Sequence, residues 1–282
     1  MKNILITGAN SYIGTSFERW MKRYDGYRID TVDTMDDKWK EADFGKYDTV
    51  FHVAGIAHAD PKPEMRELYY KVNTDLAVET AEYAKARGAR QFIFMSSIIV
   101  YGSNNTYIDK NTVPTPKNFY GDSKLQADIR LHKLQSDSFN IVSIRPPMIY
   151  GKGSKGNYPR LSVLAKKTPV FPSLKNQRSM LHIDNLCEFI KLMIDNNEHG
   201  IFYPQNREYV STAELVRSIS ELNGKKIIML PLFDPLLKLL SKKVTAFNKL
   251  FGNLVYDKNM SAYGDWRYCV NDFRESIRKT ER

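Results

Sequence analysis

A tyrosine and a lysine four residues apart carry the clearest catalytic chemistry in this sequence. Tyr120 and Lys124 belong to the segment YGDSK, and a spacing of four places two side chains on one face of a helix. A neighbouring ammonium favours the phenolate, so we expect the pKa of Tyr120 to fall from about 10 toward a working range. Tyr120 would then be a general acid or base toward a hydroxyl or carbonyl. An ordinary surface pair on a helix is the alternative, which an isolated match would favour.

A serine at the end of a predicted strand supplies a third group. The apolar run 91–96 (QFIFMS) predicts a buried strand, and Ser97 follows it directly. Its hydroxyl would hydrogen-bond the same substrate oxygen and hold it in the geometry that hydride transfer requires. The three groups would then converge on one hydroxyl or carbonyl.

A glycine-containing turn after the first predicted strand has the composition of a phosphate-binding loop. The run 2–7 predicts a strand, the stretch 13–24 predicts a helix, and Gly8, Ser11 and Gly14 lie in the turn that joins them. Glycine permits a tight bend, a small residue lets backbone amides approach a pyrophosphate, and the helix N-terminus carries partial positive charge. A strand-to-helix turn without a ligand is the alternative.

Acidic residues further along the chain bear on which dinucleotide this loop would hold. Asp33 ends the second predicted strand, at the spacing where a carboxylate meets the adenosine ribose hydroxyls. A carboxylate there repels a 2′-phosphate, which favours NAD over NADP, although Asp30 and Asp36 are close enough to take its place. Asp43 is expected near the adenine, and a solvated loop carboxylate is the equal alternative for it.

The scaffold that would position these groups is a doubly wound parallel sheet. Strands are predicted at 27–33, 48–54 and 91–96, and the stretch 64–87 predicts a long helix that Gly88 ends. Alternating strands and helices indicate a Rossmann-like α/β fold, with its ligand site beyond the carboxyl ends of the strands.

The domain prediction places a nucleotide-binding Rossmann domain at 1–150 and a smaller C-terminal substrate-binding lobe at 151–282. The segment near 179–200, including a helix at 183–194, is predicted to return to the first domain. The segment 232–251 is rich in leucine, phenylalanine and lysine at helical spacing. We interpret it as an amphipathic helix facing the core of the lobe, with an interfacial membrane helix as the alternative.

The composition and net charge of the chain limit which classes of ligand it is expected to bind. The formal net charge of +10 favours anionic partners, yet the basic residues are scattered without interleaved aromatics, so no nucleic acid is expected.

Cys187 and Cys269 are too few for a zinc cage or a disulfide framework, so we expect no metal and a reducing compartment. Neither a signal peptide nor a spanning helix is recognisable, which predicts a cytoplasmic protein that is not integral to a membrane.

Seven motifs follow one another in the order of a known family. The chain resembles, over nearly its whole length, the extended short-chain dehydrogenase/reductase family, specifically its NAD-dependent nucleotide-sugar epimerases and dehydratases. The motifs are TGANSYIG (7–14), FHVAG (51–55), VNTDLA (72–77), SSIIVYG (96–102), YGDSK (120–124), RPPMIYGKG (145–153) and RSMLHIDNL (178–186).

The resemblance implies a role for each matching residue. Ser97, Tyr120 and Lys124 would be the catalytic triad, with Lys124 also holding the nicotinamide ribose; an oxidised nicotinamide would further favour the phenolate. Arg178 would bind the substrate's pyrophosphate, as a bidentate guanidinium can, with a surface ion pair as the alternative. Asn73 matches a structural asparagine. The predicted cofactor-binding set is Gly8, Asn10, Ser11, Tyr12, Ile13, Gly14, Asp33, Asp43, Ala54, Gly55 and Lys124, and the predicted substrate-binding set is Ser97 and Arg178.

Two departures from the family pattern matter for function. The family usually has glycine where Ser11 stands, so cofactor approach there is altered or weakened. Ile98 and Ile99 stand where the sugar-nucleotide 4,6-dehydratases carry an Asp-Glu pair for water elimination, so we do not expect dehydration.

The segments 151–158, 169–186 and 250–266 resemble the bacterial UDP-sugar C4 epimerases and 4-ketoreductases of surface-polysaccharide synthesis. We therefore expect hydride transfer on the sugar of a nucleotide-diphosphate sugar. A catalytically silent NAD(P) sensor on the same fold and an enzyme for steroid-like ketones are the alternatives. The hexose, epimerisation against net reduction, and a homodimer are left open by the sequence.

Overall fold

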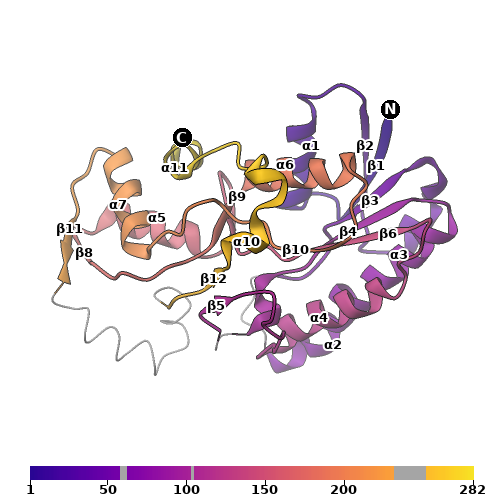
Figure 1. Ribbon diagram of the computed structural model, residues 1–282, viewed down its shortest axis with the longest axis horizontal. Helices are drawn as coiled ribbons and strands as arrows, with labels where there is room; N and C mark the ends of the chain where they lie inside the picture. The colour runs from indigo at the N-terminus through magenta and orange to yellow at the C-terminus, as the bar shows by residue number, and fades with distance from the viewer. Residues whose placement is uncertain (58–61, 103–104, 232–251) are drawn as a thin grey trace. The chain divides into compact units, whose positions relative to one another are not determined.

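The apolar runs of the N-terminal half form one six-stranded parallel sheet in the computed structural model, in the order β10-β6-β4-β3-β1-β2 (Figure 1). Its central strands are buried on both faces, as parallel strands covered by helices must be. The six strands are β1 (Lys2–Thr7), β2 (Tyr27–Val32), β3 (Thr49–His52), β4 (Gln91–Met95), β6 (Asn140–Ile144) and β10 (Gly200–Phe202).

Two compact units, interleaved along the chain, make up the part that the structure describes, which is residues 1–57, 62–102, 105–231 and 252–282. The first unit holds the six-stranded sheet and consists of Met1–Gly102, Val113–Pro146 and Leu186–Pro204. The second unit consists of Ser103–Thr112, Pro147–Asn185 and Gln205–Arg282. The Rossmann-like α/β prediction is confirmed by the parallel sheet and its flanking helices.

Helices cover both faces of the sheet, with α1 and α6 on one face and α2, α3 and α4 on the other (Figure 1). Apolar side chains explain this: Phe17 and Trp20 of α1 are buried, as are Ala81 and Ala84 of α3. The helices are α1 (Tyr12–Met21), α2 (Arg66–Tyr70), α3 (Leu76–Ala86), α4 (Phe119–His132) and α6 (Ile183–Asp195).

The long helix predicted at 64–87 is wrong in one respect, because it is interrupted. A 3-10 turn at Pro63–Met65 leads into α2, and a π-helical turn at Lys71–Asp75 separates α2 from α3. The buried side chain of Asn73 lies in this π turn and bonds to neighbouring segments. A propensity pattern cannot reveal such a break, because each residue of the stretch is compatible with an ordinary helix.

The sheet ends at β2, which pairs with β1 alone. The connection from β2 to β3 contains two 3-10 helices, Asp37–Glu41 and Phe44–Lys46, and no strand. Trp39 from the first of them is buried and packs edge-on against Tyr83 of α3, with ring centroids 5.4 Å apart. Trp39 thus joins the core that packs between the sheet and α3.

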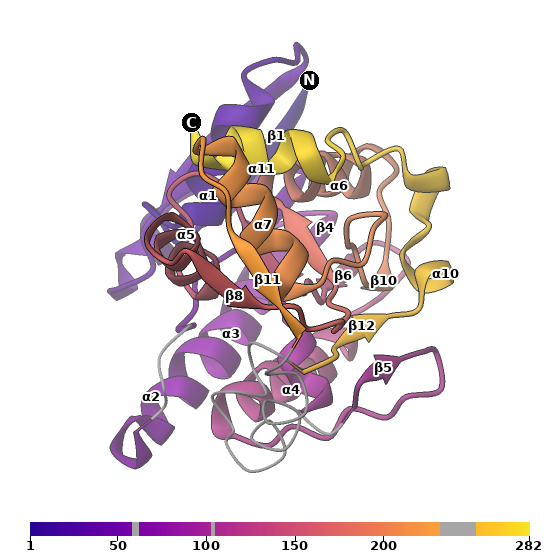
Figure 2. The same ribbon diagram turned by 90° about the vertical axis from the view of Figure 1, so that its left-hand side faces the viewer.

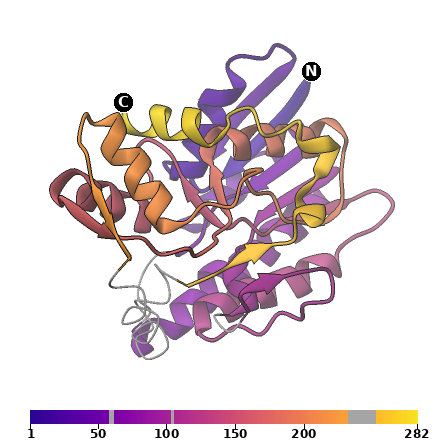
Figure 3. The same cartoon turned by 60° about the vertical axis from the view of Figure 1, so that its left-hand side comes forward.

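In the residues that the structure describes, the second unit consists of short paired strands and helices around its own core. Figure 2 shows β8 and β11 side by side near α7, and Figure 3 shows the yellow β12 beside the purple β5. The predicted helix at 232–251 lies outside the described residues. The elements are β5 (Tyr107–Ile108), β7 (Met148–Tyr150), α5 (Asn157–Lys167), β8 (Val170–Pro172), β9 (Met180–His182), α7 (Thr212–Leu222), β11 (Ile228–Leu230), β12 (Val255–Tyr256), α10 (Lys258–Ser261) and α11 (Phe273–Glu281).

Candidate active site

The turn between β1 and α1 has the backbone shape that its glycine predicts. Gly8 adopts a φ of 101°, and a Cβ at this position would lie 2.7 Å from the amide nitrogen of Ala54. Asn10 also has a positive φ, of 61°. Only glycine meets both demands at position 8, because a side chain would be strained and would collide with the neighbouring strand end.

Ser11 caps α1, and the predicted loop residues Tyr12 and Ile13 form the first turn of that helix. The Ser11 hydroxyl accepts a hydrogen bond from the amide of Gly14 at 3.1 Å. First-turn amides have no acceptors within their own helix, which gives this end of α1 donors and partial positive charge. These features fit a dinucleotide pyrophosphate, whose oxygens need such donors.

Asp33 lies directly beside this turn. The amides of Gly8 and Ala9 donate to the carbonyl of Val32 at 3.0 and 3.3 Å, so the residue after Val32 borders the loop. The Asp33 side chain is at the surface and accepts from the amide of Met35 at 3.0 Å. The structure therefore brings Asp33 and the Gly8 turn together.

Asp43 is not brought to this site. Its carboxylate accepts from the amide of Gly45 at 3.2 Å and pairs with Lys46 at 3.4 Å. A Cβ on Gly45 would lie 3.3 Å from the carbonyl oxygen of Arg87, where α3 ends and β4 is about to begin. Asp43 thus lies near the amino ends of the strands, whereas the loop lies at their carboxyl ends, and its contact with adenine stays a prediction.

The end of β3 connects the loop to the predicted catalytic lysine. The amide of Ala54 donates to the carbonyl of Thr7 at 3.0 Å, beside Gly8. A Cβ on Gly55 would lie 3.0 Å from Nζ of Lys124, so glycine leaves room there. The structure thus brings the FHVAG motif, the loop and Lys124 to one edge of the sheet.

Ser97, Tyr120 and Lys124 lie together where β4 ends against α4. The side chain of Ser97 is close enough to Tyr120 to influence its pKa, and Nζ of Lys124 donates to the carbonyl of Met95 at 2.9 Å. Asn118 begins α4 by accepting from the amide of Gly121 at 2.9 Å. This cap places Tyr120 and Lys124 in the first turns of the helix, facing the end of the strand.

The pKa of Tyr120 shifts in the direction opposite to the one expected from the sequence. Burial raises the pKa of Tyr120 to about 12, while its hydrogen bond with Ser97 opposes that rise. The predicted lowering by Lys124 is wrong for the protein alone, because the ammonium donates to Met95 and the ring of Tyr69 packs 5.9 Å from that of Tyr120. Burial also lowers the pKa of Lys124 to about 8.

Asn73 links the motifs behind these residues. Its Oδ1 accepts from the amide of Ile56 at 2.8 Å, and its Nδ2 donates to the hydroxyl of Ser123 at 3.1 Å. Ser123 in turn donates to the carbonyl of Tyr120 at 2.9 Å. Asn73 therefore ties the end of β3 to α4 and has a structural place.

His52, a buried histidine of β3, was not singled out in the sequence. Its Nδ1 lies 2.7 Å from the hydroxyl of Thr7, and its ring stacks on Phe92 with centroids 5.6 Å apart. Burial lowers the pKa of His52 to about 3, so it is neutral beneath Lys124. The signal was its place in FHVAG, where a histidine interrupts a buried apolar run.

Arg178 belongs to the second unit, where it lines a pocket with residues of α5, β7, β9 and α7. Its Nη1 donates to the carbonyl of Gly252 at 3.0 Å, and burial lowers its pKa to about 10. No acidic partner is recorded for it among the described residues, which speaks against the surface ion pair. The lining residues are Met148, Asn157, Leu161, Arg178, Met180, Val210, Ser211, Thr212 and Leu215.

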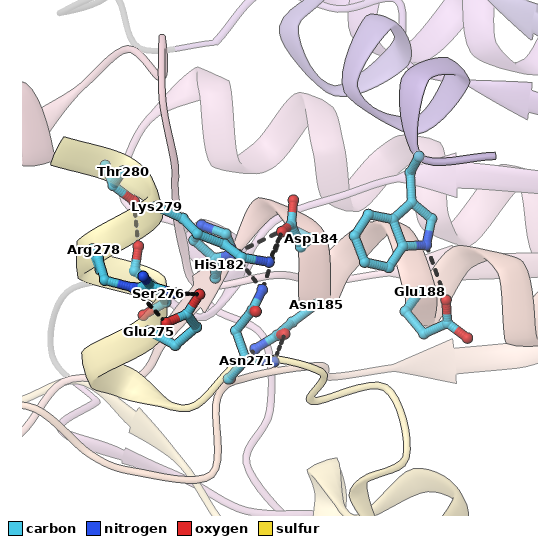
Figure 4. Close-up of polar contacts among 11 residues, drawn as sticks. His182, Asp184, Asn185, Glu188, Asn271, Glu275, Ser276, Arg278, Lys279 and Thr280 are labelled. Atoms are coloured by element: carbon cyan, nitrogen blue, oxygen red, sulfur yellow. Dashed lines mark hydrogen bonds and ion pairs between the residues drawn. The ribbon is translucent and has the colours of Figure 1, made fainter. Parts of the chain in front are cut away.

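The segment HIDN of the last motif forms a structural network in the second unit. Nδ1 of buried His182 accepts from the amide of Asp184 at 3.3 Å, and the Asp184 carboxylate accepts from Asn271 at 3.1 Å and Lys279 at 3.0 Å (Figure 4). Burial lowers the pKa of His182 to about 4. These contacts join the start of α6 to α11 and account for the motif without a catalytic role.

Comparison with known proteins decides the family. The model of the NAD dependent epimerase/dehydratase family matches residues 4–203. UDP-glucose 4-epimerase from Vibrio cholerae is 31% identical over 278 residues, which cover 89% of this chain and 83% of that protein. The chain belongs to this family. The resemblance inferred from the seven motifs is thereby confirmed.

Other relatives of this epimerase/dehydratase family member differ in what they are named for. N-acetyl-alpha-D-glucosaminyl-diphospho-ditrans,octacis-undecaprenol 4-epimerase from Escherichia coli O157:H7 is 26% identical and covers 83% of this chain and 76% of that protein. UDP-glucuronic acid 4-epimerase from Bacillus cereus, solved with NAD, has a TM-score of 0.68 at 18% identity and covers 80% of this chain and 86% of that one.

A solved reductase shares the fold as well. dTDP-4-dehydrorhamnose reductase from Bacillus anthracis, in complex with NADP, has a TM-score of 0.66 at 21% identity and covers 82% of this chain and 84% of that one. These structural similarities confirm the fold. Among the residues that the structure describes, no helix of this family member is long and apolar enough to cross a membrane.

Proposed function

We propose that this family member is an NAD-dependent enzyme that transfers a hydride at C4 of the hexose of a UDP-hexose, as a C4 epimerase or a 4-ketoreductase. The product would serve polysaccharide precursor synthesis. The observation that carries the proposal is the buried amine of Lys124, one helical turn after Tyr120, which donates to the carbonyl of Met95 at the end of β4 and lies beside Gly55 at the sheet edge that also holds the Gly8 turn.

Each residue of that constellation has a place in the proposed chemistry. Tyr120 takes the proton of the C4 hydroxyl when the hydride leaves that carbon, and returns it when the ketone is reduced. Ser97 donates a hydrogen bond to the same oxygen and orients it. Lys124, as an ammonium, holds the nicotinamide ribose. Bound NAD supplies the hydride acceptor and, once reduced, the donor.

The cofactor assignment rests on the loop and on Asp33. The positive φ of Gly8 and the first turn of α1 suit a pyrophosphate. The surface carboxylate of Asp33 beside Gly8 would repel the 2′-phosphate of NADP. Ile98 and Ile99 supply no acid or base for dehydration, which supports epimerisation or reduction.

Arg178 is the proposed contact for the diphosphate of the substrate. Its guanidinium can bind two phosphate oxygens at once, and it lines a pocket of the second unit. The net charge of +10 agrees with a small anionic ligand of this kind. Protection of the protein by UDP in thermal unfolding, lost in Arg178→Met, would support this contact.

The test separates the two reactions. Purified protein is denatured to identify any released dinucleotide, and fresh protein is incubated with UDP-hexoses with and without added NADH or NADPH. Turnover without added reductant indicates an epimerase, and dependence on stoichiometric reductant indicates a reductase. A Tyr120→Phe variant with undiminished turnover would refute the mechanism and favour a silent dinucleotide sensor.

A polyprenyl diphosphate is a second candidate carrier for the sugar. The relative from Escherichia coli O157:H7 is named for an undecaprenol-linked sugar, and it matches most of this chain. Parallel assays with a UDP-linked and an undecaprenyl-diphosphate-linked N-acetylhexosamine distinguish the carriers. Co-sedimentation with liposomes only in the presence of the lipid-linked sugar would favour the second carrier.

A further inference from the structure

Three side chains on one face of α4 contact the residues that end β4. Tyr120 and Lys124 make the first two contacts, as described above. Asp128 makes the third, because its Oδ2 accepts a hydrogen bond from the hydroxyl of Ser96 at 2.8 Å. Positions 120, 124 and 128 are four residues apart and therefore line one helical face. The proposed catalytic set accounts for two of these contacts and leaves Asp128 unexplained.

Asp128 is held in place by a buried arginine. Nε of Arg145, which follows β6 directly, lies 2.9 Å from the same Oδ2 atom, and the two side chains are 5% and 1% exposed. Nη1 of Arg145 donates to the hydroxyl of Tyr101 at 2.9 Å. Desolvation offsets much of the attraction in such a buried pair, so a net gain in stability is a weak explanation for it.

Asp128 faces several ionisable groups. Lys124 precedes it by one helical turn and His132 follows it by one, and Asp128 raises the pKa of both against the lowering effect of burial. From β3, His52 also faces Lys124 and is neutral. The Oδ1 atom of Asp128 is buried and makes no hydrogen bond to the described residues, so no donor neutralises its charge there.

We propose that Asp128, held by Arg145, is a positioning residue of the active site. Its charge keeps Lys124 an ammonium, and its bond to Ser96 fixes the strand end that carries Ser97. This inference rests on the proposed function, because Lys124 and Ser97 act on cofactor and substrate only there. With this role, the face of α4 that serves the active site extends one helical turn beyond the YGDSK motif.

The test compares the wild-type chain with the double variant Asp128→Asn/Arg145→Gln. Both charges are removed together, because Asp128→Asn alone would leave a buried cation unpaired and destabilise the fold. NADH binding is measured by fluorescence from about pH 6 to about pH 10, and turnover over the same range. We expect the pH above which NADH binding weakens to fall by roughly one unit, with turnover about tenfold lower and KM little changed.

Two variants separate charge from hydrogen bonding. Ser96→Ala removes the hydrogen bond to Asp128 and leaves the carboxylate. Turnover should therefore fall, while NADH binding should weaken at the same pH as in the wild type. Asp128→Glu keeps the charge, so its NADH binding should also weaken at the wild-type pH. Glu281→Gln is the matched control, since Glu281 is another buried, ion-paired carboxylate, 6% exposed, in the second unit. It should move neither quantity.

The proposal would be overturned by a double variant that folds and whose NADH binding weakens at the same pH as in the wild type. If the double variant does not fold, Asp128→Glu is the deciding variant. Its charge is retained, so a change in the pH at which its NADH binding weakens excludes the electrostatic role. A wild-type protein that binds neither NADH nor NADPH at any pH refutes the proposed function itself, and the two failures are thereby distinguishable.

Discussion

The hydroxyl of Ser11 accepts a hydrogen bond from the amide of Gly14 at 3.1 Å, inside the turn that we propose to bind the dinucleotide phosphates. A side chain thus engages an amide that glycine at position 11 would leave available to a ligand. The same hydroxyl begins α1 as its N-cap. Ser11 therefore stabilises the helix and would compete with a phosphate bound in this turn for a donor.

Substitutions at position 11 should separate these two effects. Ser11→Ala removes the cap and should lower the free energy of unfolding by about 1 kcal/mol, whereas Ser11→Gly should cost only a few tenths. Ser11→Gly should bind NADH at least as tightly as the wild type, because the Gly14 amide becomes available. Thermal unfolding and NADH titration of both variants provide the measurements; weaker binding in Ser11→Gly would contradict the idea of competition.

Tyr120→Phe should abolish most of the turnover and little else. Loss of the proton-transferring hydroxyl is expected to reduce turnover by about 10²- to 10⁴-fold. The ring packing against Tyr69 is retained, so the thermal unfolding temperature and NADH affinity should stay close to wild type. Phe119 also packs edge-on against Tyr69, with ring centroids 5.0 Å apart, so Phe119→Leu is the control for ring packing and should be destabilised but active.

Dinucleotide affinity should weaken as the pH rises through about 8, because burial lowers the pKa of Lys124 to that value. Above it the ammonium loses the proton that the ribose hydroxyls need as a donor. The stability of the free protein should change in the opposite direction. Between about pH 8 and the ordinary lysine value of 10.5 the unfolded chain binds more protons, so the free energy of unfolding rises with pH.

Lys124→Met should remove both pH effects. Its free energy of unfolding, subtracted from that of the wild type at each pH, isolates the contribution of this one group from the other lysines and tyrosines. Chemical denaturation and NADH titration from about pH 7 to about pH 10 supply the data. An unchanged pH dependence of NADH binding in Lys124→Met would show that another group titrates.

Asn73→Ala should destabilise the first unit by about 2–3 kcal/mol, because the buried hydroxyl of Ser123 and the partly buried backbone groups of Ile56 lose their partners. Turnover should fall as α4 loses its tie to β3. Thr74→Val is a matched change one residue away, since the Thr74 hydroxyl donates to the carbonyl of Ser123 at 2.7 Å. It should lower stability with a smaller loss of turnover. Equal losses would argue against a special role for Asn73.

The sequence predicted the parallel sheet because its strands are apolar runs in alternation with helices, a pattern that depends on local residues alone. The strand runs at 2–7 and 91–95 lie where the pattern placed them. The π turn around Asn73 and the two 3-10 helices after β2 were beyond reach, because both depend on contacts with distant segments. The position of Asp43 relative to the Gly8 turn was beyond reach for the same reason.

The candidate site divides in a similar way. Ser97, Tyr120 and Lys124 could be found because chemistry fixes both their types and their spacing. The direction of the Tyr120 pKa could not, since it depends on how completely Tyr69 and other neighbours exclude water and on where the Lys124 amine donates. Asp128 was overlooked, because an aspartate inside a helix is ordinary until Ser96 and Arg145 are seen to meet it.

The chain passes back and forth between its two units, with Ser103–Thr112 and Leu186–Pro204 each leaving one unit to join the other. No single cut in the gene therefore separates one unit from the other. Truncations at either end would remove strands or helices from an otherwise complete core and should yield insoluble fragments. New substrate preferences must arise by substitution or loop insertion, since a whole lobe cannot be exchanged by one recombination event.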